Sequence, residues 1–196
     1  MAYIIKSKQS NINLKYLPKV FKSKNGDNVK IGRYQESDEA ELHEILKYII
    51  NIEGDSYPQI DISSVEDFRA YYLSHDVFVC KNDSTGEILG SFYVKPNFPG
   101  RCSHICNGGF AVKKSARGNG LATKMTDIFL QVARDLGYRA VMFNLVFVSN
   151  EFAIKIYRKL GFKEIGRIPS AGDLKDKGYM DAIQFHYDLL TIDKSV

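Results

Sequence analysis

The stretch that decides the fold is Val112-Lys-Lys-Ser-Ala-Arg-Gly-Asn-Gly-Leu-Ala122. A short apolar run leads into it, and the apolar spacing from Leu121 to Leu136 predicts a long helix that Gly137 stops. Glycines let successive backbone N–H groups turn toward one point, and a helix N-terminus adds about half a positive charge there. The stretch therefore predicts a loop that binds a phosphate or pyrophosphate at the start of a helix.

This loop differs from two other phosphate-binding patterns. It is not a Walker loop, because no Gly-Lys-Ser/Thr follows at the required spacing. It is not the dinucleotide fingerprint, because the third glycine is replaced and no acidic residue ends the next strand. We expect fixed positive charge around the loop from Lys113, Lys114, Arg117 and Lys124.

The rest of the chain predicts strands interleaved with helices. Ser37 is expected to cap an amphipathic helix that runs to Ile50, and Ser64 a short second helix. A Gly108-Gly109 pair within an expected strand indicates a bulge or a close approach by another backbone. These elements predict an α/β fold with a central mixed, mostly antiparallel sheet and about four helices. Strands are expected at 29–33, 77–80, 88–94, 106–112, 140–148, 162–168 and 179–188, and further helices at 121–136 and 150–160.

Composition restricts the class of protein. A length of 196 residues fits one domain, and 44% apolar with 26% charged residues is typical of a soluble globular chain. The net charge of +4 permits an anionic ligand but does not argue for nucleic acid, so no nucleic-acid partner is predicted. No apolar run approaches the roughly 20 residues that cross a bilayer, so no membrane partner is predicted either.

The N-terminal segment has a composition of its own. The first 26 residues hold six lysines and neither an acid nor an arginine. We therefore predict a basic leader at 1–28, packed loosely or not at all, and a single domain at 29–196. A mitochondrial presequence would be Arg-rich, and three cysteines make no disulfide framework, so the cytoplasm is the expected compartment and the mitochondrion the lesser alternative.

Two motifs together resemble a known superfamily. The pattern Arg-x-x-Gly-x-Ala at 117–122 is similar to the pyrophosphate-binding motif of GNAT acetyltransferases. Asn150-Glu-Phe-Ala-Ile-Lys-Ile-Tyr-Arg-Lys-Leu-Gly-Phe162 resembles the second signature of that superfamily, in the right order and separated by one helix and one strand. The resemblance implies the GNAT fold, acetyl-CoA as cosubstrate and transfer of an acetyl group to an amine.

A closer resemblance covers about 53–190. It rests on Ser56-Tyr-Pro-Gln59, Phe92-Tyr-Val-Lys-Pro-Asn97, Arg101-Cys-Ser-His-Ile-Cys-Asn107, Phe143-Asn-Leu-Val-Phe-Val-Ser-Asn150 and Arg167-Ile-Pro-Ser-Ala-Gly172. These segments look like fungal acetyltransferases that detoxify L-azetidine-2-carboxylate, a proline analogue. The resemblance implies a small amine substrate such as a cyclic secondary amino acid. The phosphate loop and Tyr157 depart from that group, which puts the substrate, but not the cofactor, in question.

The superfamily resemblance assigns roles to residues. Tyr157 matches the position that protonates the leaving thiolate, and Asn150 a position that hydrogen-bonds the cofactor arm. The alternatives are an aromatic packed under the sheet and a helix N-cap. The pantetheine arm is implied to pair with the strand at 106–112, where the N–H near Phe110 would polarise the carbonyl. The implied cofactor-binding residues are Phe110, Ala111, Val112, Arg117, Gly118, Asn119, Gly120, Leu121, Ala122, Asn150 and Tyr157.

No carboxylate lies on the strand at 106–112, so the general base has three candidates. These are His104, Glu53 and a water held by two asparagines, Asn107 and Asn144. In the proline-analogue enzymes, asparagines matching these two positions hold the substrate, whereas the alternative for Asn144 is a buried strand residue. Cys102, His104 and Cys106 alternate and would share one face of a strand, but they lack a fourth ligand, so no metal site is predicted.

Several alternatives stay open at this point. A protein or polyamine N-acetyltransferase would need an open groove or acidic residues, neither of which the sequence displays clearly. A non-catalytic acyl-CoA-binding module would keep the fold without turnover. Homodimers are common among the relatives implied, although no segment reads as a dimer surface.

Overall fold

An eight-stranded mixed sheet forms the centre of the computed structural model, which describes residues 5–192. The strand order is β1-β2-β3-β4-β5-β6-β8-β7, and every neighbouring pair is antiparallel except β5 and β6. This confirms the predicted α/β class and the mostly antiparallel sheet. The strands are β1 (Lys19–Lys22), β2 (Asn28–Arg33), β3 (Asp76–Asn82), β4 (Ile88–Pro96), β5 (Ile105–Val112), β6 (Ala140–Phe147), β7 (Lys163–Leu174) and β8 (Gly178–Asp188).

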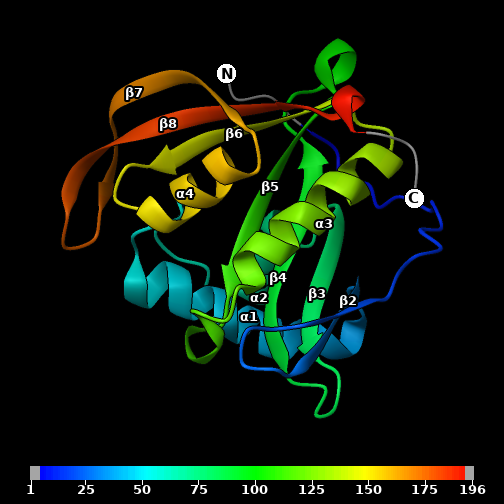
Figure 1. Ribbon diagram of the computed structural model, residues 1–196. Coiled ribbons are helices and arrows are strands. Elements are labelled where there is room, and N and C mark those ends of the chain that lie inside the picture. The colour runs from blue at the N-terminus through cyan, green and yellow to red at the C-terminus, as the bar shows by residue number, and fades with distance from the viewer. Residues whose placement is uncertain (1–4, 193–196) are drawn as a thin grey trace.

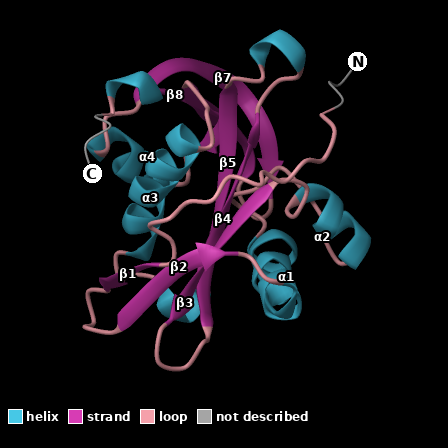
Figure 2. Ribbon diagram, turned by 90° about the vertical axis from the view of Figure 1, so that its right-hand side faces the viewer, coloured by secondary structure: helices cyan, strands magenta, loops and turns pink. Residues whose placement is uncertain are grey.

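Helices cover both faces of the sheet (Figures 1 and 2). One hydrophobic cluster joins the sheet to α3 and α4, and a second joins it to α1, η2 and α2. No helix within residues 5–192 is long and apolar enough to span a bilayer. The helices are α1 (Glu39–Lys47), the π-helix η2 (Tyr48–Glu53), α2 (Val65–Tyr71), α3 (Leu121–Asp135) and α4 (Glu151–Lys159), with 3-10 turns η1 (Glu36–Asp38), η3 (Gly100–Cys102), η4 (Lys114–Ala116) and η5 (Leu189–Thr191).

The glycine pair in β5 lies between two aromatic rings, one on each face of the sheet. A Cβ on Gly108 would lie 2.4 Å from Cε2 of Phe129 in α3, and a Cβ on Gly109 would lie 2.5 Å from Cε1 of Tyr93. Side chains therefore crowd both glycines, whereas the expected approach by another backbone stays a prediction. The register between β4 and β5 continues through both glycines without a bulge.

The described part of the predicted leader packs against the domain. β1 pairs with β2, with Phe21 opposite Val29, and Leu14 is buried in the core. The Lys8 N–H also donates to the Ser74 carbonyl at 3.1 Å. A boundary at residue 29 would therefore cut a β-hairpin, because apolar side chains among the lysines give this segment surface to bury.

Three other local expectations need correction. Ser37 does not cap the first helix, since η1 already begins at Glu36 and the Asp38 carboxylate accepts the Gln35 N–H at 3.1 Å. The end of that predicted helix is the π-helix η2, which Gly54 terminates with a φ of 63°. Cys102 lies exposed in η3 whereas Cys106 is buried in β5, because the chain enters the strand only at residue 105.

The sheet opens between its two parallel strands. β5 and β6 pair only at Ile105 with Ala140 and at Cys106 with Val141, and then diverge (Figure 1). On its other edge β5 stays paired with β4 as far as Val112. The fold therefore leaves one edge of β5 open immediately before the glycine-rich loop.

Candidate functional site

The alternation of backbone groups along β5 shows which of them face the gap. The Lys113 N–H donates to the Leu89 carbonyl at 2.9 Å, and the Asn97 N–H donates to the Ile105 carbonyl at 2.8 Å. These bonds direct the polar groups of the odd-numbered residues of β5 toward β4. The N–H and C=O groups of Gly108, Phe110 and Val112 consequently face the open edge toward β6.

Part of this open edge is already occupied. The Asn107 side chain accepts the Gly108 N–H at 2.8 Å, and the Tyr57 hydroxyl donates to the Phe110 carbonyl at 2.9 Å. Arg117 Nε donates to the Val112 carbonyl at 3.3 Å. The Phe110 N–H has no partner on this edge within the described chain. It is therefore free for an extended ligand, at the position where the sequence predicts a cofactor arm.

The glycine-rich loop supplies a second set of free donors. Gly118 and Gly120 have φ angles of 82° and 80°, a conformation that favours glycine. The first helical bond runs from the Lys124 N–H to the Gly120 carbonyl at 3.2 Å. Among residues 5–192, the N–H groups of Gly118, Asn119, Gly120, Leu121 and Ala122 have no hydrogen-bond partner. Five free N–H groups at the start of α3 are the donors that a phosphate needs.

Most of the cations predicted around the loop form ion pairs with carboxylates of the protein. Arg117 forms a bidentate pair with Glu53, with N–O distances of 2.8 and 2.7 Å. Lys113 pairs with Glu41 and Glu87, and Lys124 pairs with Asp127. Their charges are thus partly neutralised, and the backbone carries more of the anion site than the sequence suggests.

Sequence analysis missed Lys24, which lies beside the loop. Its N–H donates to the Asn119 carbonyl at 3.1 Å, and its side-chain carbons lie 3.4 Å from where a Cβ on Gly120 would stand. No motif signalled this, because Lys24 belongs to the β1–β2 turn and reaches the loop only through the sheet.

Tyr157 lies in α4 beneath the open edge. Its ring packs on Phe143 and Phe162, with centroid distances of 4.6 and 5.3 Å, which agrees with the alternative of an aromatic under the sheet. Its hydroxyl has no hydrogen-bond partner in the described residues, and burial raises the pKa of this hydroxyl above the ordinary value. The side chain therefore holds its proton at neutral pH, as a proton donor must.

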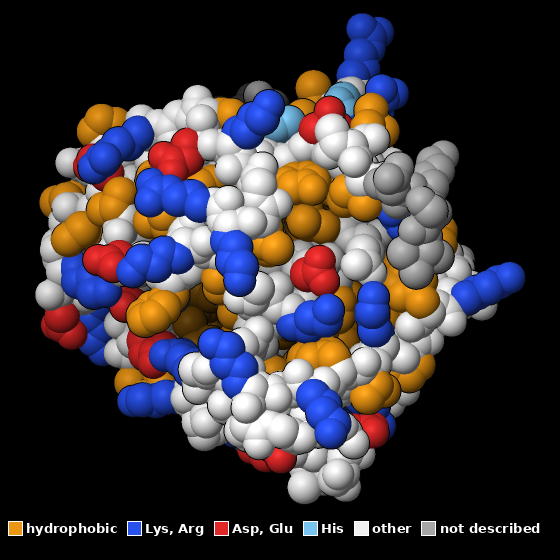
Figure 3. Space-filling view, viewed as in Figure 1, with side chains coloured by type: hydrophobic (Ala, Val, Ile, Leu, Met, Phe, Trp, Pro, Cys, Tyr) orange, Lys and Arg blue, Asp and Glu red, His pale blue; other side chains and the backbone are white. Residues whose placement is uncertain are grey.

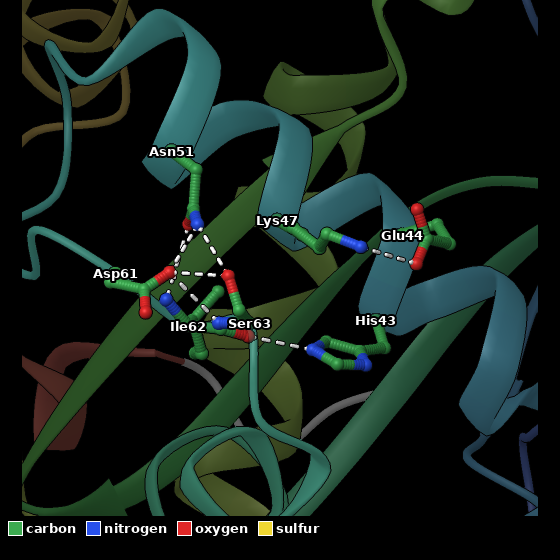
Figure 4. Close-up of polar contacts among 7 residues, drawn as sticks. All are labelled: His43, Glu44, Lys47, Asn51, Asp61, Ile62 and Ser63. Carbon is green, nitrogen blue, oxygen red and sulfur yellow. Dashed lines mark hydrogen bonds and ion pairs between the residues drawn. The ribbon is translucent and has the colours of Figure 1, made fainter.

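A fixed loop brings a second tyrosine to the site. Asn51 in η2 accepts the Ile62 N–H at 3.1 Å and donates to Ser63 Oγ at 2.9 Å and to Asp61 (Figure 4). His43 Nε2 bonds the Ile62 carbonyl at 2.7 Å. These contacts anchor the end of the loop at 54–64, from which Tyr57 reaches Phe110.

The other end of this loop is held by the β7–β8 hairpin. The Lys175 N–H donates to the Gly54 carbonyl at 3.1 Å, and Lys177 pairs with Asp55 at 2.8 Å. Beside η2 and below α4, Figure 3 shows a hollow with a hydrophobic floor and basic residues near its rim.

Buried aromatic side chains gather on the face of β4 and β5 that η2 and α2 cover. The hydroxyls of Tyr71 and Tyr93 lie 3.3 Å apart, and the Tyr57 and Tyr71 rings meet edge to face at 6.4 Å. Burial, and then the charges of neighbouring tyrosines including Tyr157, raise the pKa values of Tyr57 and Tyr93. We call Tyr57, Gln59, Tyr71, Tyr93 and Lys95 the acceptor-side cluster.

The two predicted substrate-holding asparagines have partners of their own. Asn144 donates to Asn97 at 2.5 Å and accepts from it at 2.8 Å, so the two amides satisfy each other. Because Asn97 follows β4 and Asn144 lies in β6, this bridge joins the two strands that flank β5. The Asn107 side chain accepts the N–H of the next residue, Gly108. Asn97 ends the segment Phe92–Asn97, on which the resemblance to the proline-analogue enzymes partly rests, but the sequence gave Asn97 no role.

The remaining predicted residues also have defined positions. Asn150 caps α4 by accepting the Ala153 N–H at 3.2 Å, which confirms the N-cap alternative and leaves the cofactor role as a prediction. His104 is exposed in a turn, where its Nδ1 lies 3.2 Å from the Arg101 carbonyl. Glu53 is held by Arg117. Neither base candidate is therefore free beside the Phe110 N–H.

Comparison with known proteins finds relatives across most of the chain. The model of the acetyltransferase (GNAT) family matches residues 46–162. The N-acetyltransferase aca1 of Schizosaccharomyces pombe is 36% identical over 177 residues, which cover 80% of this chain and 84% of that protein. A GCN5-related N-acetyltransferase from Kribbella flavida superposes with a TM-score of 0.76 at 25% identity, covering 82% of this chain and 97% of that one. The protein yncA from Salmonella typhimurium, solved with its cofactor acetyl-CoA, has a TM-score of 0.73 at 18% identity, covering 86% and 96%.

The amide bridge gives a stability prediction. Asn97→Ala and Asn144→Ala should each lower the free energy of unfolding by about 1 kcal/mol, because each leaves the other amide without its partner. The double variant should lose clearly less than the sum, as urea unfolding would show. Asn13→Ala, at an exposed asparagine with no side-chain hydrogen bond among the described residues, should be neutral. Strictly additive losses would mean that the two amides do not support each other.

Proposed function

Because the chain belongs to the acetyltransferase (GNAT) family, we propose that it transfers the acetyl group of acetyl-CoA to the nitrogen of a small amine. A cyclic secondary amino acid such as azetidine-2-carboxylate or another proline analogue is the substrate we favour. The observation that carries this proposal is the open edge of β5, with a free Phe110 N–H, leading directly into the five free N–H groups of the glycine-rich loop.

The residues fit acetyl-CoA in two places. The N–H groups at 118–122 and the start of α3 would hold its pyrophosphate, with Lys24 nearby as an added cation. The open edge of β5 would pair with its extended arm, and the Phe110 N–H would polarise the thioester carbonyl. Acetyl-CoA supplies the activated acyl group. The chain itself supplies orientation, the hydrogen bond at Phe110 and a proton donor.

Proton transfer sets the remaining demands. An amine with a pKa near 10 must lose a proton before it attacks, which costs roughly 4 kcal/mol at pH 7. The amine nitrogen forms the new bond to the acetyl carbon as the carbon–sulfur bond breaks. The ammonium gives its first proton to water, since His104 bonds the Arg101 carbonyl and Glu53 is held by Arg117. After attack, Tyr157 gives its proton to the departing sulfur and regains one, through water, from the acylated nitrogen.

The acceptor-side cluster favours a small substrate over the alternatives. A polyamine site would need carboxylates, whereas this cluster holds tyrosines, an amide and a lysine. A peptide would need an open groove, but both ends of the loop at 54–64 are tied down. A non-catalytic acyl-CoA-binding module would bind acetyl-CoA without releasing CoA. The free thiols favour the cytoplasm, and a homodimer is a prediction from the resemblance alone.

The direct test is CoA release from acetyl-CoA, separated by chromatography, with a panel of amines. The panel holds azetidine-2-carboxylate, proline analogues, ordinary amino acids, a polyamine and a histone-like peptide. We expect selective turnover with the ring imino acids. Turnover confined to the polyamine or the peptide would contradict the small-substrate proposal, and tight acetyl-CoA binding without any turnover would favour the binding module.

The loop assignment predicts a loss of cofactor binding in Gly120→Glu. The variant places a negative charge and a strained side chain against the phosphate site, so the Kd for acetyl-CoA, measured by calorimetry, should rise by about 100-fold. Gly100→Glu is the matched control, because Gly100 also has a positive φ of 59° but lies in η3 with nothing within 4 Å of an added Cβ. Equal affinity in the two variants would refute the loop assignment.

The acid assignment predicts a loss of rate in Tyr157→Phe. Removing the hydroxyl should lower kcat by about 100-fold, because a positioned proton donor contributes on that scale. The Kd for acetyl-CoA should change by less than about twofold, since the packed ring remains. Tyr187→Phe is the control, a partly buried tyrosine whose ring lies 5.0 Å from Phe162. An unchanged kcat in Tyr157→Phe would leave Tyr157 with a packing role.

A further inference from the structure

Lys95 is the one cation of the acceptor-side cluster. It lies in β4 opposite Asn107. Tyr93, two residues earlier in β4, lies opposite Gly109, so Lys95 and Tyr93 point to the same face of the sheet. Its ammonium lies 4.5 Å from the centroid of the Tyr71 ring and 4.4 Å from that of Tyr93. It also donates to the Tyr71 carbonyl at 3.4 Å. The side chain is thus held on the same face as the Tyr57 and Tyr93 side chains.

No carboxylate in the described chain pairs with Lys95. Asp76, the acid opposite the neighbouring residue Val94, is held by Arg33 at 2.6 Å. Val94 packs in the cluster beneath α3, so its neighbour Lys95 points to the other face. Burial lowers the pKa of Lys95 to about 8, so the ammonium is still mostly charged at pH 7. A half-buried cation without an anion is unfavourable unless a ligand supplies one.

The same cluster contains a buried hydrogen-bond acceptor that no donor among the described residues reaches. Gln59 Oε1 is buried and has no hydrogen-bond partner among the described residues. Burial raises the pKa of Tyr71, and hydrogen bonds that involve the side chains of Tyr93 and Gln59 oppose this shift. Tyr71 therefore contacts both Gln59 and Lys95. One cluster thus offers an oxygen for an N–H group and an ammonium for an anion.

We propose that Lys95 binds the carboxylate of the amine substrate, so that the acceptor is an amino or imino acid rather than a simple amine. This deepens the proposed function and rests on it. Gln59 Oε1 receives an N–H of the same substrate, and the tyrosine rings surround its carbon skeleton. A polyamine is disfavoured, because its ammonium groups would face Lys95. Lys95 acts as an anion-binding cation and not as the base, because its ammonium is still mostly charged at pH 7.

Lys95→Met tests this assignment, because methionine keeps most of the side-chain volume and removes the charge. kcat/KM is measured for azetidine-2-carboxylate and for its carboxamide, which keeps the ring and the amine. In the variant, kcat/KM should fall by about 10- to 100-fold for the carboxylate and by less than about threefold for the carboxamide. Lys155→Met is the control, since Lys155 also lies over a ring, at 5.9 Å from Phe152, but is exposed and paired with Glu151.

The outcomes separate the two proposals. Equal losses for the two substrates, or no loss for either, would overturn the role of Lys95 and leave N-acetyl transfer standing. The role of Lys95 would also be overturned if the wild type acetylated only amines that lack a carboxylate. If the wild type acetylates no amine, the proposed function fails. The carboxylate site is then tested by comparing the shift in Tm that L-proline causes with the shift that L-prolinamide causes. A shift specific to proline that Lys95→Met abolishes would support the carboxylate site, and its absence would reject it.

Discussion

The early end of the pairing between β5 and β6 is the constraint on which the site depends. Only two residue pairs join these strands before they diverge. Aromatic rings fill the wedge beneath the opening, with Phe143 at 5.9 Å from Phe110 and 4.6 Å from Tyr157. On its other edge β6 pairs with β8 from Ala140 to Phe147, with an irregular register between Phe143 and Val146. Because β4 satisfies only one edge of β5, the other edge keeps backbone groups that a ligand can use.

The ion pair between Arg117 and Glu53 then couples this edge to the acceptor side. Arg117 bonds both the Val112 carbonyl and the Glu53 carboxylate, so it ties the glycine-rich loop to the end of η2. From η2 the chain continues into the loop that carries Tyr57, which returns to β5 at the Phe110 carbonyl. The arginine that the motif assigns to the cofactor is therefore also a structural link.

The charges of the site are divided between the glycine-rich loop, which follows the end of β5, and the acceptor-side cluster. The phosphate side relies on backbone N–H groups and helix geometry, because three of its four predicted cations have carboxylate partners. On the acceptor side, Lys95 has ring faces and a carbonyl around it and no acid within the described residues. Positive charge is thus left uncompensated on the side where the substrate, and not the cofactor, is expected to bind. The neighbouring tyrosines keep their protons across neutral pH, because burial raises their pKa values.

The sequence by itself determined the elements whose signals are local. The glycines of the loop, the apolar spacing of α3 and the signature from Asn150 to Phe162 act within a few residues, so they predicted the fold and the order of its elements. Only the tertiary structure decided which distant residues contact each other. Asn97 bonds Asn144, Arg117 pairs with Glu53, and Lys24 bonds the glycine-rich loop. It also placed Lys95 among tyrosines and joined β1 to the sheet. The physical reason is that a side chain's partner depends on strand register and helix docking, which bring together residues whose separation in the chain leaves no pattern.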